Sequence, residues 1–197
     1  MESTILTALL GFVFAATITP GPNNIMVMAS GANFGFRRSI PHLCGVSTGV
    51  IAVILLVGIG LMVVFDALPF LEVALRVVSA IYLLWLAWRI ANARPPESGI
   101  PDAKPLSFLQ AATFQWVNPK VWATGLSAIA LFSPERSFGS VMGIALAFAA
   151  IGLASNAIWT WMGTVLRLWL TVGNRLRVFN VAMALLLVAS LYPVLAH

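Results

Sequence analysis

Charged residues and cysteine are both scarce in this chain of 197 residues. Only 9% of the residues are Asp, Glu, Lys or Arg, against roughly 25% in an ordinary soluble domain, so a water-soluble fold would expose large apolar patches. Cys44 is the single cysteine, which excludes an internal disulfide, a CxxC redox pair and a thiolate metal cluster. His42 and His197 lie far apart and match no metal motif. The composition therefore predicts no metal and no other cofactor.

Acidic residues are scarcer than basic ones, and the formal net charge is +5. The 11 Lys and Arg residues are scattered among apolar runs and form no basic stripe, so nucleic acid is not an expected partner. In a membrane protein, such a basic surplus reflects the orientation of the chain in the bilayer.

Hydrophobic residues make up 60% of the chain, about 118 residues, and six membrane-spanning helices of about 20 residues would use about 120. The start of the chain lacks a basic n-region, and its apolar run is too long for the core of a signal peptide. We therefore expect this segment to be retained as a transmembrane helix. The predicted fold is an all-α integral membrane protein with six transmembrane helices, surrounded by membrane lipids, in which residues 1–197 form a single transmembrane domain. The six stretches that predict these helices are 3–36, 39–65, 73–91, 105–134, 137–166 and 178–197.

The charges between these stretches predict the orientation of the spans. The opposite connections carry only two basic residues together with four of the six acidic ones. The positive-inside rule places the more basic connections in the cytoplasm and both chain termini outside, with the Pro-rich linker 94–105 cytoplasmic. The eight basic residues of the cytoplasmic side are Arg37, Arg38, Arg89, Arg94, Lys104, Arg167, Arg175 and Arg177.

Two of the stretches are interrupted near their midpoints by residues that do not continue a helix. The first interruption reads Thr19-Pro20-Gly21-Pro22-Asn23-Asn24, and each of its prolines removes a backbone donor and clashes with the preceding turn. The second reads Gln115-Trp116-Val117-Asn118-Pro119-Lys120, and Lys120 is the one charge deep in a predicted span. Non-helical backbone in a bilayer is tolerated only where protein or water covers it, and an intramembrane charge usually marks function. Both interruptions are therefore candidate sites.

The two interruptions lie about 100 residues apart, so each half of the chain holds three predicted spans and begins with a broken one. An odd number of spans in each half gives the halves, approximately residues 1–93 and 106–197, opposite orientations. This pattern predicts two inverted three-helix repeats, with the substrate site between them near the midplane of the membrane.

A new half-helix begins after each interruption, and its first N–H groups and its dipole attract anions. Together with Lys120, these two ends form a predicted receptor for a carboxylate, and the side-chain oxygens nearby suit an ammonium group, so the predicted ligand is a zwitterion such as an amino acid. Kinking by proline, helix capping by asparagine and, for Asn156, hydrogen bonding between helices are the alternative explanations. The predicted substrate-binding residues are Thr19, Pro20, Gly21, Pro22, Asn23, Asn24, Gln115, Asn118, Pro119, Lys120 and Asn156.

The motifs Thr19-Pro20-Gly21-Pro22-Asn23 and Gln115 through Lys120, together with the length and the six apolar stretches, resemble the LysE/RhtB family of bacterial amino-acid exporters. The resemblance covers essentially the whole chain and implies export across the inner membrane. Members of the family differ in substrate. The resemblance therefore implies one of four substrate groups: basic amino acids, homoserine and threonine, leucine-like residues, or cysteine and O-acetylserine. Because no acidic residue lies deep in a predicted span, we expect a neutral substrate.

The expected function is therefore secondary export of a neutral amino acid by alternating access, with no enzyme activity and no ATP-binding motif. The alternatives are export of divalent metal ions, although Lys120 would repel them, a passive channel or assembly subunit, and an intramembrane enzyme. If protons are the coupling ion, Lys120, Asp66 or His42 would have to carry them, or a group of the substrate would. Glycines within stretch 39–65 predict close helix packing, either within the subunit or across a homodimer; they are Gly45, Gly49, Gly58 and Gly60.

Overall fold

The computed structural model describes residues 3–60, 70–93, 104–135, 137–170 and 172–192. In these ranges the chain forms helices joined by short connections and no strand, which confirms the predicted all-helical fold for this part of the chain. Asp66, residues 94–103 of the predicted linker, and the two chain ends lie outside the described residues. The elements are α1 (Ser3–Ile18), α2 (Pro22–Phe34), α3 (Phe36–Gly58), α5 (Phe70–Ala91), α6 (Phe108–Phe114), the 3-10 turn η2 (Gln115–Val117), α7 (Pro119–Phe132), α8 (Phe138–Leu170) and α9 (Arg175–Ala189).

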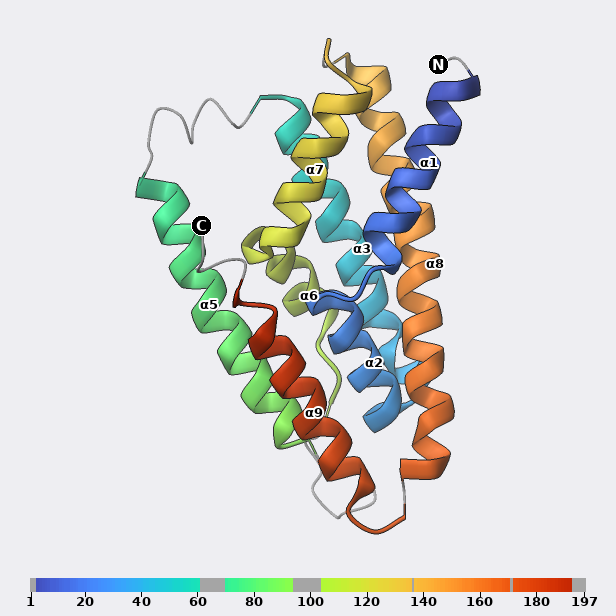
Figure 1. Ribbon diagram of the computed structural model, residues 1–197, viewed down its shortest axis with the longest axis vertical. Coiled ribbons are helices and arrows are strands. Elements are labelled where there is room, and N and C mark those ends of the chain that lie inside the picture. Colours follow the sequence, from blue (N-terminus) through green and yellow to red (C-terminus); the bar gives the residue numbers. More distant parts are fainter. Residues whose placement is uncertain (1–2, 61–69, 94–103, 136, 171, 193–197) are drawn as a thin grey trace.

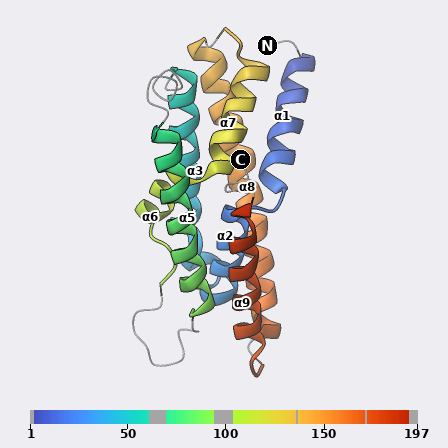
Figure 2. The ribbon, with the colours of Figure 1, turned by 60° about the vertical axis from the view of Figure 1, so that its left-hand side comes forward.

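The helices form an elongated bundle in which the direction of the chain alternates (Figure 1). In that view α1 and α2 descend, α3 ascends, α5 descends, α6 and α7 ascend, α8 descends, and α9 ascends to about mid-height. Each of the six apolar stretches seen in the sequence contains helix. Helices α5 and α9 contact each other along one side of the bundle (Figure 2), and α3 contacts α8.

Three described helices are long and apolar enough to cross a membrane: Phe36–Gly58, Val73–Ala91 and Phe138–Leu170. The pair Thr4–Ile18 and Pro22–Phe34 adds a fourth span if the two bent helices are counted as one. The other helices are shorter than a span of about 20 residues. Within the described ranges, α7 has 14 residues and α9 has 15.

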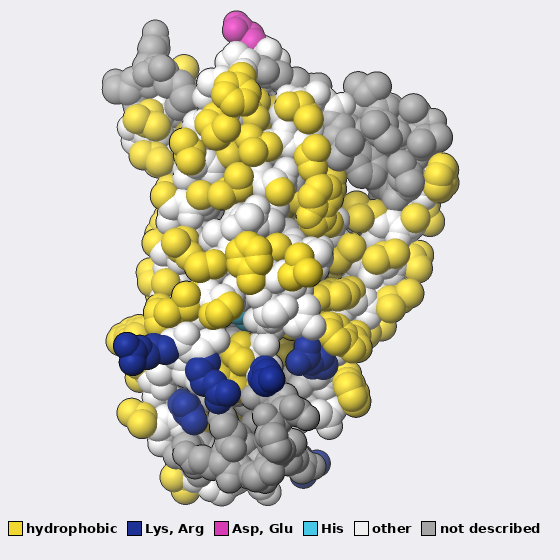
Figure 3. All heavy atoms as spheres, turned by 180° about the vertical axis from the view of Figure 1, so that it is seen from behind, with side chains coloured by type: hydrophobic (Ala, Val, Ile, Leu, Met, Phe, Trp, Pro, Cys, Tyr) yellow, Lys and Arg dark blue, Asp and Glu magenta, His cyan; other side chains and the backbone are white. Residues whose placement is uncertain are grey.

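The surface of the bundle is apolar where that of a soluble protein would be polar. Exposed side chains include Leu168, which is 82% exposed, and Phe138, which is 75% exposed, whereas several asparagines and serines are buried in the interior. Figure 3 shows apolar side chains over most of one face, with Lys and Arg gathered towards the lower end and an acidic side chain at the top. This arrangement suits a protein whose solvent is lipid.

Glycines allow the central helices to approach each other closely. A Cβ atom at Gly31 of α2 would collide with the backbone of Thr160 in α8, and one at Gly163 of α8 would collide with the backbone of Met28 in α2. Gly45 and Gly49 of α3 face α6 in the same way, so the structure places them in contacts within the subunit. Small residues at such contacts let two helix backbones pack closely within a membrane.

We expect Gly163→Ala to destabilise the protein by about 1–3 kcal/mol, because a methyl group there overpacks a backbone-to-backbone contact. Gly143→Ala is the matched control in the same helix, since a Cβ at Gly143 meets nothing within 4 Å. Thermal unfolding of both purified variants in detergent, followed by circular dichroism, tests the difference. Equal midpoints for the two variants would contradict the close approach of α2 and α8.

Candidate functional site

The first predicted interruption is present in the structure, between the last residue of α1 and the first residue of α2. The two helices are bent by 57° across it. Asn24 closes the end of α1, because its side-chain amide donates to the backbone oxygens of Thr17 at 2.9 Å, Thr19 at 3.3 Å and Ile18 at 3.4 Å. Asparagine was expected to cap the second half-helix or bind substrate. The Asn24 side chain does not cap α2 but satisfies the free carbonyls of the first half-helix, and its role in binding substrate stays a prediction.

The second predicted interruption is centred on Asn118, one residue before the start of α7 at Pro119. The Asn118 side-chain oxygen accepts a hydrogen bond from the backbone N–H of Lys120 at 3.2 Å, which makes it the N-cap of α7. The Trp122 indole donates to the backbone oxygen of Trp116 at 2.8 Å. The backbone on both sides of this interruption therefore has side-chain partners from the chain itself.

Hydrogen bonds join the two interruptions to each other. The Asn23 side-chain amide donates to Oε1 of Gln115 at 2.8 Å, and the Gln115 amide donates back to Oδ1 of Asn23 at 3.1 Å. The Lys120 ammonium donates to the backbone oxygen of Thr19 at 2.6 Å. Residues about 100 positions apart are thus linked by three bonds, so each interruption helps to satisfy the other.

Gly21 provides the space in which the Lys120 side chain lies. A Cβ atom at Gly21 would stand 2.9 Å from Cδ and 3.0 Å from Nζ of Lys120. The φ angle of Gly21 is −168°, which is extended backbone, so the glycine is required by the neighbouring lysine and not by its own backbone conformation. The first interruption therefore determines where the ammonium group of the second one sits.

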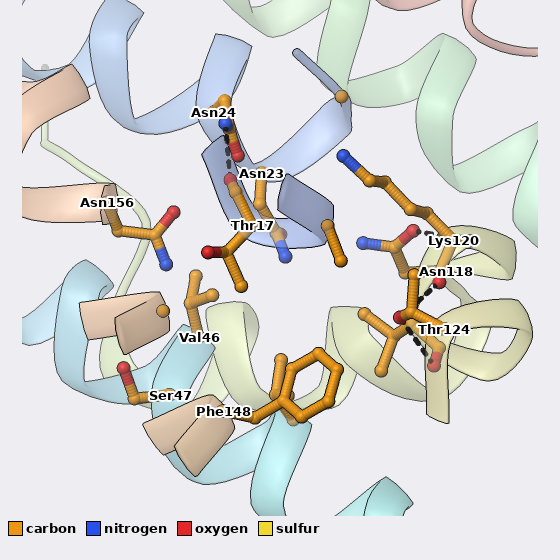
Figure 4. A pocket seen from close by; sticks show the side chains of 15 residues that line it. Thr17, Asn23, Asn24, Val46, Ser47, Asn118, Lys120, Thr124, Phe148 and Asn156 are labelled. Atoms are coloured by element: carbon orange, nitrogen blue, oxygen red, sulfur yellow. Dashed lines mark hydrogen bonds between the residues drawn. The ribbon is translucent and has the colours of Figure 1, made fainter. Parts of the chain in front are cut away.

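A small cavity with a volume of about 50 Å³ lies where the two interruptions meet (Figure 4). This volume holds a few water molecules. Residues of α1, α2, α3, α7 and α8 line the cavity, together with Gly21 and Asn118 from the interruptions. Amide and hydroxyl groups, one ammonium group and the Phe148 ring face it, and its lining contains no acidic residue.

Six of the eleven predicted site residues line this cavity, and five do not. Pro20, Pro22 and Pro119 shape the chain at the interruptions, whereas Thr19 contributes its backbone oxygen and its hydroxyl donates to the backbone oxygen of Ala15 at 2.6 Å. Gln115 is fully buried behind the cavity, bonded to Asn23. The six that line the cavity are Gly21, Asn23, Asn24, Asn118, Lys120 and Asn156.

Several lining residues were missed by the reasoning from sequence. Thr124 lies four residues after Lys120 on α7, whereas Thr17 belongs to α1 and is separated from Gly21 by the break between α1 and α2. The spacing of Thr124 from Lys120 is a signal that could have identified Thr124, and no such signal marks Thr17. Nothing in the sequence distinguishes Ser47 of α3 or Phe148 of α8 from other residues of their apolar helices, because only the packing of the helices brings them to the cavity.

The two half-helix ends differ in their capacity to bind an anion. At the start of α7, the N–H groups of Lys120, Val121 and Trp122 all bond to Asn118. At the start of α2, the N–H groups of Asn23 and Asn24 have no partner within the described residues, and the first bonded N–H is that of Ile25. The free donors beside the cavity are therefore those of α2, with Lys120 next to them.

Comparison with known proteins identifies the family. The family model described as LysE type translocator matches residues 14–190 of this chain. The chain belongs to the LysE type translocator family. This membership agrees with the resemblance carried by the two motifs, and it places the chain in a family of transport proteins.

Several curated proteins resemble this LysE-family chain along nearly its whole length. The "Cysteine/O-acetylserine efflux protein" of Escherichia coli strain K12 and the protein of the same name in Shigella sonnei strain Ss046 are each 35% identical over 194 residues. The matches cover 95% of this chain and 96% of each relative. No solved structure matches the chain significantly.

We expect a double-mutant cycle to show that Asn23 and Gln115 act as a pair. Asn23→Ala and Gln115→Ala should each lower the free energy of unfolding by about 1–3 kcal/mol, because each removes both hydrogen bonds of the pair. The double variant should lose less than the sum, by about 0.5–3 kcal/mol. Denaturant unfolding in micelles measures the cycle, and Thr113→Ala, an exposed residue bonded within its own helix, should combine additively with Asn23→Ala.

Proposed function

We propose that this LysE-family protein is a secondary transporter that exports neutral amino acids or close derivatives from the cytoplasm by alternating access. The observation that carries this proposal is the meeting of two interrupted helices at one cavity, with the Lys120 ammonium group between them. The relatives named as cysteine/O-acetylserine efflux proteins make those two compounds the first substrates to test.

The cavity offers complementary groups to the two ends of an amino acid. A carboxylate would bind the Lys120 ammonium and the free N–H groups at the start of α2. The ammonium group of the substrate would bind side-chain oxygens of Thr17, Asn118 or Asn156, all of which line the cavity. A basic substrate would carry a second positive charge into a lining that holds Lys120 and no carboxylate, so Coulomb repulsion favours neutral compounds.

A volume of about 50 Å³ is too small for an amino acid, so binding requires the two interruptions to separate. The bonds that must lengthen are the Asn23–Gln115 pair and the bond from Lys120 to the Thr19 oxygen. Because the Lys120 ammonium has three donors, it can retain one protein contact while it binds a carboxylate. In this proposal the bonds between the interruptions hold the closed state, and the substrate replaces them during transport.

The architecture that we propose for this cycle is six spans in two inverted repeats. The corresponding elements are α1–α2 with α6–α7, α3 with α8, and α5 with α9. The first broken segment packs on α8 and the second packs on α3, while α3 contacts α8 and α5 contacts α9, as inverted repeats require. The proposed halves are residues 1–93 and 106–197, and transport would move one against the other.

The distribution of charge supports an orientation with both termini outside the cytoplasm. The junction of α2 and α3, the end of α5, and the junction of α8 and α9 all lie at the lower end of Figure 1 and carry basic residues. Figure 3 shows Lys and Arg gathered at that end. By the positive-inside rule, that end faces the cytoplasm of a bacterial inner membrane.

Accessibility of introduced cysteines tests this orientation. In a Cys44→Ser background, which has no other cysteine, Glu135→Cys should react with a membrane-impermeant maleimide on intact cells. Arg38→Cys should react only after the cells are permeabilised, because the α2–α3 junction is cytoplasmic in this orientation. The reverse pattern would overturn the proposed topology.

Export from preloaded proteoliposomes tests the function and the role of Lys120. We expect efflux of O-acetyl-L-serine and L-cysteine but not of L-lysine, and we expect Lys120→Met to lower the efflux rate by about 10–100-fold, through loss of a charged hydrogen bond. Gly21→Ala should lower it less, because the new methyl group displaces the lysine side chain without removing its charge.

Arg38→Gln is the control, since Arg38 is exposed and lies outside the cavity, and it should leave the efflux rate unchanged. Size-exclusion chromatography in detergent establishes that each variant is folded. Efflux by Lys120→Met at the rate of the unmodified protein would reject the anion-binding role. Efflux of none of these amino acids by the unmodified protein would reject the proposed function.

A further inference from the structure

A second and larger cavity lies at the basic end of the bundle. It has a volume of about 270 Å³ and is bounded by α2, α3, the end of α5 and the segment Lys104–Leu106. Its deep wall contains Met26 and Leu86, which belong to the apolar core. None of its lining residues lines the cavity at the interruptions, so it is a separate space.

His42 of α3 faces this cavity with no partner for its ring. The residue is 1% exposed, and neither ring nitrogen has a hydrogen-bond partner in the described part of the chain. An imidazole carries at least one N–H donor, and buried polar groups almost always have a partner. Both nitrogens are closed off by the packing around the ring, so a molecule in the cavity becomes their partner once the neighbouring side chains move aside.

Ser30 of α2 also lines this cavity and has spare acceptor capacity. Its hydroxyl lies 2.7 Å from that of Ser39, and Ser39 donates to the backbone oxygen of Gly35 at 2.9 Å. Ser30 is therefore the donor to Ser39, and its oxygen remains free to accept. Asn33 is different, because its amide is already bonded to Ala29 and to Asn180. His42 and Ser30 together thus offer acceptors to a donor group such as an ammonium.

The residues that line this cavity include two cationic ones, Arg89 and Lys104, and no acidic one. Lys104 is exposed and has no ion-pair partner in the described chain. The Arg89 guanidinium lies over the Trp85 ring, 5.0 Å from its centroid, which holds it in place while its N–H groups stay available. A carboxylate therefore has two cationic partners here, while the polar groups of His42 and Ser30 are buried.

The two cavities are arranged along the same pair of helices. His42 and Val46 are four residues apart on α3, and the first lines the large cavity while the second lines the small one. On α2, Asn23 lines the small cavity and Met26, three residues later, lines the large one. Residues at these spacings share a helix face. Met26 and Val46, both in one apolar cluster, form the layer between the cavities.

We propose that the larger cavity is a second binding site, on the cytoplasmic side, for the amino acid that is exported, with its carboxylate on Arg89 and Lys104 and its ammonium group on His42 and Ser30. This inference rests on the proposed function. It makes the larger cavity the place where the substrate is held before the apolar layer at Met26 and Val46 opens towards Lys120.

The histidine content of the chain allows a direct test. There are 2 histidines, so His197→Gln leaves His42 as the only one. The variant is purified without a histidine tag, labelled with ¹⁵N-histidine and placed in nanodiscs of phosphatidylcholine. Titration with O-acetyl-L-serine should shift the His42 ring signals in NMR spectra, and the shift should persist in a Lys120→Met background, because the two sites are separate.

Arg89→Gln should raise the concentration that half-saturates this shift by about tenfold, since it removes a charged hydrogen bond. Arg175→Gln is the matched control, because Arg175 also lies over a tryptophan, 4.5 Å from the Trp169 ring centroid, but outside the cavity. The control should titrate like its parent. Since Arg89 is on the rim, this comparison does not depend on altering the buried histidine.

Three results would overturn the inference and leave the proposed function standing. The first is unchanged His42 signals in a preparation that exports O-acetyl-L-serine, which would reject the second site and leave the proposed function standing. The second is loss of the shift in the Lys120→Met background, which would assign it to the first site. The third is a His42 shift produced by phosphatidylglycerol nanodiscs but not by the amino acid, which would make the cavity a lipid headgroup site. If no amino acid is exported, the proposed function fails and this inference fails with it.

Discussion

The rest of the structure depends on how the backbone is satisfied at its two interruptions. A helix within a membrane bonds all its own backbone groups, and wherever proline breaks it the free groups need other partners in surroundings that supply little water. Here the partners come from the chain itself. Asn24 closes α1, Asn118 opens α7, and the Lys120 ammonium binds the backbone oxygen of Thr19. The first two bonds lie within one interruption each, and the third crosses between them, so each interruption also helps to satisfy the other.

This mutual dependence constrains the packing of the helices around it. Lys120 and Thr19 can meet only if the two broken segments lie side by side, and their neighbours must then approach closely. Gly31 against Thr160 and Gly45 against Phe108 are the contacts that allow this approach. The polar groups gather inside, and the outer surface is left to apolar side chains such as Leu168. The bundle is organised around a polar centre, as a protein in lipid can be.

The same bonds connect stability with transport in the proposed function. A lysine that binds a carbonyl oxygen in the closed state is also positioned to bind a carboxylate, because both ligands offer oxygen acceptors to an ammonium group. The amide pair of Asn23 and Gln115 adds bonds that can be broken and remade without leaving a charge unpaired. In the proposed transport cycle, the bonds that break are hydrogen bonds between side chains. The close backbone-to-backbone contact at Gly163 stays in place and holds α2 against α8.

The sequence by itself determined the class of protein, the helical composition and the positions of the interruptions. Scarcity of charge excludes a soluble fold, and a proline cannot continue a helix wherever the chain places it, so these properties depend only on local composition. The family motifs also lie within short segments, and the match over residues 14–190 confirmed the family.

Only the tertiary structure decided which groups face one another. Asn24 closing the preceding half-helix, Gln115 lying behind the cavity and Ser47 lining it all depend on how helices distant in the sequence are packed. Local sequence specifies which groups the backbone must satisfy, whereas the partner of a group is set by distances between segments, such as the 2.6 Å from Lys120 to Thr19, that exist only after the helices have assembled.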